Sequence, residues 1–103
     1  MKIEILYFDG FPNHEPAERA VREVLAEIGI EAEVERVNVS DEATAQRVKF
    51  PGSPTIRVDD EDVTPPEDDD QYSLRCRVYQ TSSGFAGVPD KEAIREKIRE
   101  AMA

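Results

Sequence analysis

Apolar residues recur at two different spacings along this chain, and each spacing predicts its own type of element. Residues 2–8 alternate and then become wholly apolar, which predicts a strand that enters the middle of a sheet. Between Pro16 and Gly29, apolar residues recur every three or four positions, which predicts a first helix that ends at the glycine. Residues 30–39 alternate in one parity and then in the other, which predicts a second strand with a bulge or an early bend.

Proline and charged residues divide the second half of the chain into shorter elements. Ser40 is expected to cap a short helix that runs to about Val48, and Pro51 lies beyond its end. Residues 55–65 predict a strand, a charged turn and a second short strand. Residues 72–80 alternate well enough to predict a strand of their own.

The C-terminal part of the chain predicts a loop and a closing helix. Residues 82–87 are rich in serine and glycine, so we expect a flexible loop there, with Phe85 anchored beneath the last helix. Asp90 is placed to cap that helix, whose apolar residues share one stripe. The order strand, helix, strand, helix, strands and helix predicts a single α/β domain, residues 1–103, with a mixed sheet.

Length and charge restrict the partners that such a domain can have. A chain of 103 residues suits one domain, and its formal charge of -10 repels nucleic acid phosphates and anionic lipid, so neither is an expected partner. No apolar run approaches the roughly 20 residues that cross a bilayer, and no signal peptide is recognisable, so a cytoplasmic location is expected. The acidic, lysine-poor composition fits either a protein of a high-salt habitat or an ordinary acidic protein.

Cys76 is the single cysteine of the chain, which excludes an internal disulfide and a cysteine-built zinc site. It shares its parity with Leu74 and Val78, and on that interpretation it is a small buried hydrophobic residue. On the alternative interpretation it is a reactive thiol that meets the first loop across the end of the sheet. The acidic stretch 59–70 lacks the glycine and glutamate spacing of a calcium loop, so we predict a solvated loop there, with no metal and no cofactor.

Two loops carry the residues with the most chemical interest. The first, DGFPNHEP at residues 9–16, opens the first helix, whose free N–H groups and dipole stabilise an anion or a thiolate. His14 in this loop could act as a general base or bind an acidic group, or it could be an ordinary surface histidine. In the second, GSPTIRV at residues 52–58, Pro54 either shapes a site or only kinks the chain before a strand.

Together these stretches resemble the thioredoxin fold and, more narrowly, a group of small thioredoxin-like proteins related to alkylmercury lyase. The stretches that carry the resemblance span most of the length and are YFDGFPNH, GSPTIRV, CRVY and GVPDKEAI. The resemblance implies a mixed sheet of about four strands flanked by helices, a cis peptide bond before Pro54, and a bound partner that pairs with the backbone there. It also implies a cysteine where this chain has Phe11, so disulfide exchange between two cysteines is not expected.

The expected site is a groove between the two loops. Its expected binding residues are Phe11, Pro12, Asn13 and His14 from the first loop and Ser53, Pro54 and Thr55 from the second. On this interpretation the chain is a redox-degenerate thioredoxin-like protein that binds a thiol-bearing peptide or small molecule without dithiol–disulfide turnover. One alternative is an enzyme-like role, thiol transfer or organomercurial and soft-metal handling, with Cys76 as the catalytic residue. Another is a structural or dimerisation module that uses Phe11 as an apolar contact, and the chain is expected to be a monomer or a homodimer.

Overall fold

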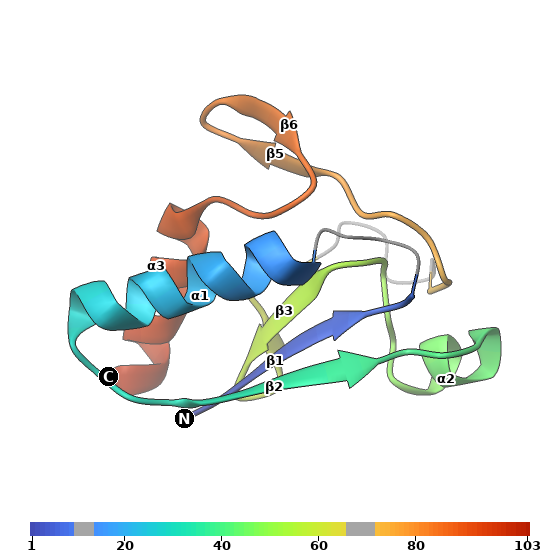
Figure 1. Ribbon diagram of the computed structural model, residues 1–103, viewed down its shortest axis with the longest axis horizontal. Helices are drawn as coiled ribbons and strands as arrows, with labels where there is room; N and C mark the ends of the chain where they lie inside the picture. The colour runs from blue at the N-terminus through green and yellow to red at the C-terminus, as the bar shows by residue number, and fades with distance from the viewer. Residues whose placement is uncertain (10–13, 66–71) are drawn as a thin grey trace.

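The computed structural model describes residues 1–9, 14–65 and 72–103. The elements follow one another in the expected order of strand, helix, strand, helix, strands and helix (Figure 1). Their bounds are β1 Lys2–Tyr7, α1 His14–Ile28, β2 Glu33–Asn38, α2 Glu42–Arg47, β3 Thr55–Val58, β4 Glu61–Asp62, β5 Tyr79–Thr81, β6 Gly84–Ala86 and α3 Lys91–Met102. Within the described residues, no helix is both long enough and apolar enough to cross a bilayer.

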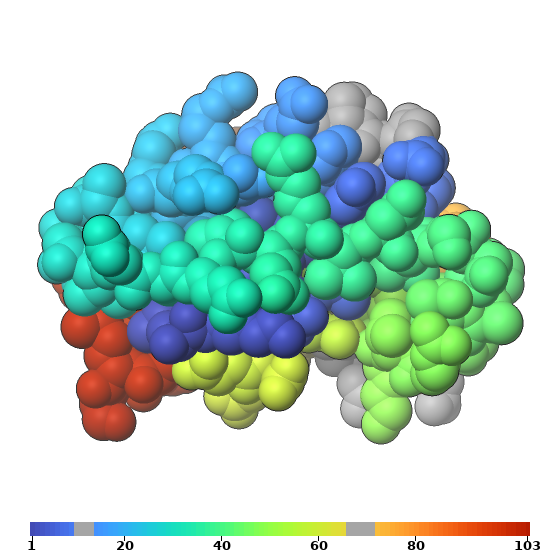
Figure 2. Space-filling view, turned by 60° about the horizontal axis from the view of Figure 1, so that its bottom comes forward, coloured from blue at the N-terminus to red at the C-terminus, as the bar shows by residue number. Residues whose placement is uncertain are grey.

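The described strands form a mixed four-stranded sheet in the order β2-β1-β3-β4 and a separate hairpin of β5 and β6. β1 and β2 are parallel, as expected for strands joined through a helix, whereas β3 is antiparallel to β1 and β4 is antiparallel to β3. Figure 2 shows β2 at the surface, between the atoms of α1 and the first residues of β1. The predicted α/β architecture with a mixed sheet is therefore confirmed.

Apolar side chains cover both faces of the sheet. On one face, Ile3 and Ile5 of β1 pack against the apolar stripes of α1 and α3 in the larger cluster. Leu6 points to the opposite face because successive strand residues alternate, and there it packs with Val39 and Phe50. α2 closes this smaller cluster at one end of the sheet, so the core lies in two layers around β1 and β3.

The second strand has no bulge, so the bulge that was one alternative of the prediction is wrong. Its pairing with β1 is continuous over six residues, from Lys2 opposite Glu33 to Tyr7 opposite Asn38. The apolar residues of β2 change from one parity to the other because apolar clusters lie against both faces of this edge strand. Val34 packs against the larger cluster, and Val37, on the other parity, packs against the smaller one.

The caps of the two later helices also differ from the expectation. Asp41, not Ser40, caps α2, because its side chain accepts a hydrogen bond from the backbone N–H of Thr44 at 2.7 Å. Asp90 occupies the position before α3, but its side chain makes no cap hydrogen bond. It accepts instead from the backbone N–H of Ser82 at 2.8 Å, which ties the hairpin to the start of α3.

Residues 82–87, predicted as a flexible loop, belong instead to the β5–β6 hairpin, which stands apart from the main sheet (Figure 1). Phe85 is 78% exposed and is not anchored beneath the last helix, so that prediction is wrong. The cause is the hairpin pairing, which places Phe85 opposite Gln80 on a ribbon with no layer of the core above it.

The strand predicted over residues 72–80 is also wrong, because only its last two residues belong to β5. β4 pairs with Arg57 and Val58 at the end of β3, whereas the segment 75–77 meets the chain at Ser53, just before β3 begins. The segment before β5 makes a single parallel bridge, between Ser53 and Cys76.

A candidate thiol site beside the turn at Pro54

The turn that contains Pro54 lies at the end of the sheet from which β1 leads toward α1. Thr55, the first residue of β3, is paired with Leu6 near the C-terminal end of β1, which fixes this placement. The peptide bond between Ser53 and Pro54 is cis. The predictions of a cis bond here, and of a turn at the same end of the sheet as the first loop, are both confirmed.

Ser53 connects this turn to the segment that carries the cysteine. The N–H of Ser53 donates to the carbonyl of Arg75 at 2.8 Å, and the N–H of Arg77 donates to the carbonyl of Ser53 at 2.9 Å. These two bonds place Cys76 directly opposite Ser53. The structure thus brings the lone thiol next to Ser53 and Pro54, across a sequence separation of 23 residues (76 less 53).

Gly52 allows the two segments to approach so closely. Its φ of +143° is one that other residues rarely adopt, and a Cβ there would lie 3.0 Å from the Cβ of Arg77 and 3.2 Å from the carbonyl oxygen of Arg75. Thr55 supports the same turn, because its hydroxyl donates to the Gly52 carbonyl at 2.7 Å. Thr55 was predicted as a binding residue, but its hydroxyl is used to stabilise the turn itself.

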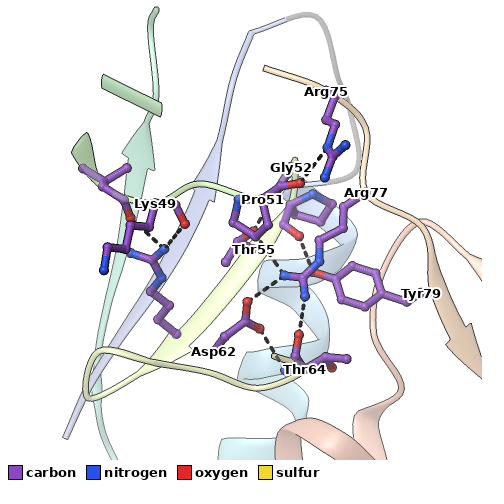
Figure 3. A network of polar contacts seen from close by, with 12 residues as sticks. Lys49, Pro51, Gly52, Thr55, Asp62, Thr64, Arg75, Arg77 and Tyr79 are labelled. Atoms are coloured by element: carbon purple, nitrogen blue, oxygen red, sulfur yellow. Dashed lines mark hydrogen bonds and ion pairs between the residues drawn. The ribbon is translucent and has the colours of Figure 1, made fainter. Parts of the chain in front are cut away.

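Arg77 anchors the cysteine-bearing segment to β4 (Figure 3). One terminal nitrogen of its guanidinium donates to Asp62 at 2.8 Å and to the Thr55 hydroxyl at 3.3 Å, and the other donates to the carbonyl of Thr64. The side chains of Arg77 and Asp62 are only 9% and 12% exposed, so this ion pair is largely shielded from water. Its charge is thus held by Asp62, away from the thiol.

Tyr79 contacts both Arg77 and the turn at Pro54. The central carbon of the Arg77 guanidinium lies 4.6 Å from the centre of the Tyr79 ring, and the Tyr79 hydroxyl donates to the carbonyl of Pro54. Burial raises the pKa of the Tyr79 phenol, which stays protonated and available as a donor. The turn at Pro54 is therefore bonded to residues on both sides of Cys76.

Hydrogen bonds also hold the residues before Cys76. The N–H of Ser73 donates to the carbonyl of Phe50 at 3.1 Å, and Nε of Arg75 donates to the carbonyl of Pro51 at 3.1 Å. α2 contributes a third bond, from the N–H of Leu74 to the side chain of Glu42 at 3.2 Å. The segment is therefore fixed along its length, and the thiol has a defined position.

Cys76 is exposed, so its interpretation as a small buried residue is wrong. The segment joins the rest of the described chain by a single bridge, at Ser53, and its thiol side opens into a surface hollow. Cys76 lines an open hollow of about 690 Å³, together with Pro65, Val78 and Phe85. Val78 and Phe85 are 66% and 78% exposed, so the thiol lies in a surface depression whose wall includes exposed apolar side chains beside polar ones.

The Ser53 side chain is fully buried, and its hydroxyl has no hydrogen-bond partner. Residues directly opposite one another in a bridge project their side chains to the same side, so the hydroxyl and the Cys76 thiol share one side of the pair. A buried polar atom without a partner is rare in folded proteins and calls for an explanation.

Only the two ends of the first loop belong to the described residues. Phe11, Pro12 and Asn13 lie outside the described residues, and so does the predicted groove between Phe11 and Pro54. His14 is the first residue of α1, and its ring stacks on that of Tyr7 with centres 4.2 Å apart. This stacking gives His14 a structural contact at the end of β1.

A second hollow, of about 490 Å³, runs along the outer face of α1 and contains no thiol. Its charges pair with one another, since Glu18 accepts hydrogen bonds from Arg36 and, at 2.9 Å, from Arg22. These bonds lower the pKa of Glu18. Among the described residues, no cluster of three or more His, Cys, Asp or Glu side chains could hold a metal ion.

The structural role of Asp62 was not predicted from the sequence, because Asp62 belongs to the acidic stretch 59–70, which was expected to be a solvated loop. Its ion pair with Arg77 was not predicted either. No local pattern shows that one acid among its neighbours faces inward, because its partner lies 15 residues away. The only signal is the predicted short strand after β3, which would place its residues beside the sheet.

Comparison of the chain with protein-family models, with curated proteins and with solved structures found no match in any of the three. No relative therefore assigns a role to Cys76 or Ser53. The role of these residues has to follow from their own placement and chemistry.

Proposed function

We propose that the chain is a thioredoxin-like domain that captures a thiol-bearing peptide or small molecule from a disulfide of that compound, as a mixed disulfide on Cys76, without dithiol–disulfide turnover. The single observation that carries the proposal is the bridge between Ser53 and Cys76, which puts an exposed thiol beside the turn at Pro54. The mixed sheet in the order β2-β1-β3-β4 and the position of Pro54 directly before β3 support the fold assignment.

The reaction is one step of thiol–disulfide exchange. The thiolate of Cys76 attacks one sulfur of a disulfide, a new bond forms between that sulfur and Cys76, and the other sulfur leaves as a thiolate. The chain has no second cysteine that could attack the product. The adduct therefore persists until an external thiol releases it, which makes the domain a carrier of thiol compounds.

Binding of a partner to the backbone of Ser53 is the less favoured alternative. Its N–H and carbonyl already bond to Arg75 and Arg77, so a partner strand would first have to displace that segment. The shielded ion pair between Arg77 and Asp62 opposes the displacement. Handling of a soft metal is also less favoured, because such ions need more than one soft ligand and the chain has one thiol.

Exchange with hydroxyethyl disulfide, followed by intact-mass spectrometry, tests the proposal. The folded protein is expected to gain one hydroxyethylthio group, at a rate at least equal to that of the free pentapeptide Leu–Arg–Cys–Arg–Val, which corresponds to residues 74–78. Added reductant is expected to restore the original mass. Labelling that occurs only in denaturant would show that the thiol is not presented by the fold, and the proposal would fail.

A further inference from the structure

The segment around Cys76 has a backbone edge to which no described residue bonds. In an extended chain, the backbone groups of successive residues point in alternate directions. Ser53 uses the carbonyl of Arg75 and the N–H of Arg77, so the N–H and carbonyl of Cys76 point away from it. Neither group of Cys76 has a hydrogen-bond partner among the described residues. A donor and an acceptor therefore lie next to the thiol, on its outer side.

Apolar side chains lie next to this edge. Val78 and Phe85 belong to the few large apolar residues that are exposed in the described part of the chain, and both line the hollow beside Cys76. Val78 is two residues from Cys76, so in an extended segment it projects to the same side. An apolar side chain of a partner would be covered by these two residues once its cysteine is joined to Cys76.

Charge favours a basic partner. The molecule has a formal charge of -10, and Pro65, which lines the hollow, belongs to the stretch 59–70, in which eight of twelve residues are acidic. One arginine of the hollow, Arg77, is neutralised by Asp62, while Nε of the other, Arg75, is bonded to the Pro51 carbonyl. The long-range field of the molecule therefore attracts a cationic peptide.

We infer that the thiol compound captured by Cys76 is an extended cysteine-containing peptide segment, with an apolar residue two positions from its cysteine, on the same side as the sulfur, and a positive net charge. The segment adds as a strand to the free edge of Cys76 and places its apolar side chain against Val78 and Phe85. This inference rests on the proposed disulfide exchange and selects a peptide over a small molecule.

Activated peptides provide the test. The probe is the blocked peptide Lys–Cys–Lys–Leu, carried as its mixed disulfide with thionitrobenzoate, and the coloured thionitrobenzoate released by exchange gives the rate. Comparison probes are the hydroxyethyl mixed disulfide and the same peptide with N-methyl groups on the two residues beside its cysteine. Each rate is divided by the rate with the free pentapeptide of residues 74–78, which removes differences in intrinsic reactivity.

We expect the corrected rate with the peptide to exceed the corrected rate with the hydroxyethyl probe by about tenfold. N-methylation should lower the peptide rate about two- to tenfold, since each backbone hydrogen bond contributes modestly. Val78→Ser and Phe85→Ser are expected to slow the leucine peptide about three- to tenfold more than they slow the hydroxyethyl probe. Met102→Ser is the matched control, because Met102 is an exposed apolar residue outside the hollow, and it should change neither rate.

Equal corrected rates for the normal peptide, the N-methylated peptide and the hydroxyethyl probe would overturn the inference while leaving the exchange reaction in place. Unchanged peptide rates in both Val78→Ser and Phe85→Ser would overturn it as well. Failure of every probe to react with the folded protein is a different result, because it would refute the proposed function itself.

Discussion

Replacing Arg77 by methionine removes the ionic anchor of the cysteine-bearing segment while keeping a side chain of similar length. In the native protein the guanidinium bonds to Asp62, Thr55 and Thr64 and packs on the ring of Tyr79. The substitution leaves the Asp62 carboxylate, only 12% exposed, without a counter-charge. We therefore expect Arg77→Met to be strongly destabilising.

The size of the loss follows from these contacts. Removal of one partner of a buried ion pair typically costs about 3–5 kcal/mol. Asp62 keeps one hydrogen bond, from the N–H of Thr64 at 2.8 Å, and it has slight access to water, so we expect the lower end of that range, about 3 kcal/mol. For a domain of this size, such a loss corresponds to a fall of about 12–24 °C in the melting temperature.

Urea unfolding of the wild type, Arg77→Met, Asp62→Leu and the double variant measures this effect. If the charge left on Asp62 causes the loss, the double variant should be more stable than the sum of the two single effects predicts, by about 1–3 kcal/mol. Arg99→Met, at an exposed position near the end of α3, is the control and should change stability by less than about 0.5 kcal/mol. A loss below about 1 kcal/mol in Arg77→Met, or strict additivity in the double variant, would refute this reasoning.

Three further predictions concern other parts of the fold. Gly52→Ala should cost about 2 kcal/mol or more in urea unfolding, because its Cβ would meet that of Arg77 at 3.0 Å; wild-type stability would contradict the close approach. Glu18→Gln should lower stability by about 0.5–1 kcal/mol at pH 7. Hydrogen bonds from Arg36 and Arg22 lower the pKa of Glu18 from its ordinary value of 4.5. The stability difference between wild type and Glu18→Gln should therefore be full above pH 4.5 and disappear as the pH falls through the lowered pKa. A stability difference that does not change with pH would exclude this cause. Phe85→Ser should change stability by less than about 0.5 kcal/mol, whereas a loss of about 3–5 kcal/mol would mean that the ring is anchored after all.

The long periodic segments could be predicted from the sequence because their pattern repeats over several turns or pairs. Residues 2–8 and the stripe that ends at Gly29 correspond to β1 and α1. Short segments gave the errors, because contacts with distant residues decide their structure. Residues 72–80 alternate like a strand, yet this segment pairs with the turn before β3 at one position, between Ser53 and Cys76, and only its last two residues belong to β5.

The candidate site depended on both kinds of signal. The position of Pro54 before a strand is visible locally, and so is the presence of a single thiol at Cys76. Their pairing through Ser53 is a contact between distant residues, which the sequence offered only as the alternative that Cys76 meets the sheet end. The exposure of Cys76 and Phe85 could not be predicted, because alternation shows which residues share a side but not whether anything covers that side.

The separation of the β5–β6 hairpin from the main sheet makes the thiol site open to redesign. Within the described residues its strands pair only with each other, and the exposed Ser82 and Ser83 form its tip. New residues placed at Phe85 would therefore face the hollow beside Cys76 without entering either layer of the core. A library of residues at position 85 would vary the choice of captured peptide with little effect on folding stability, because the buried Tyr79 of the same hairpin stays in place.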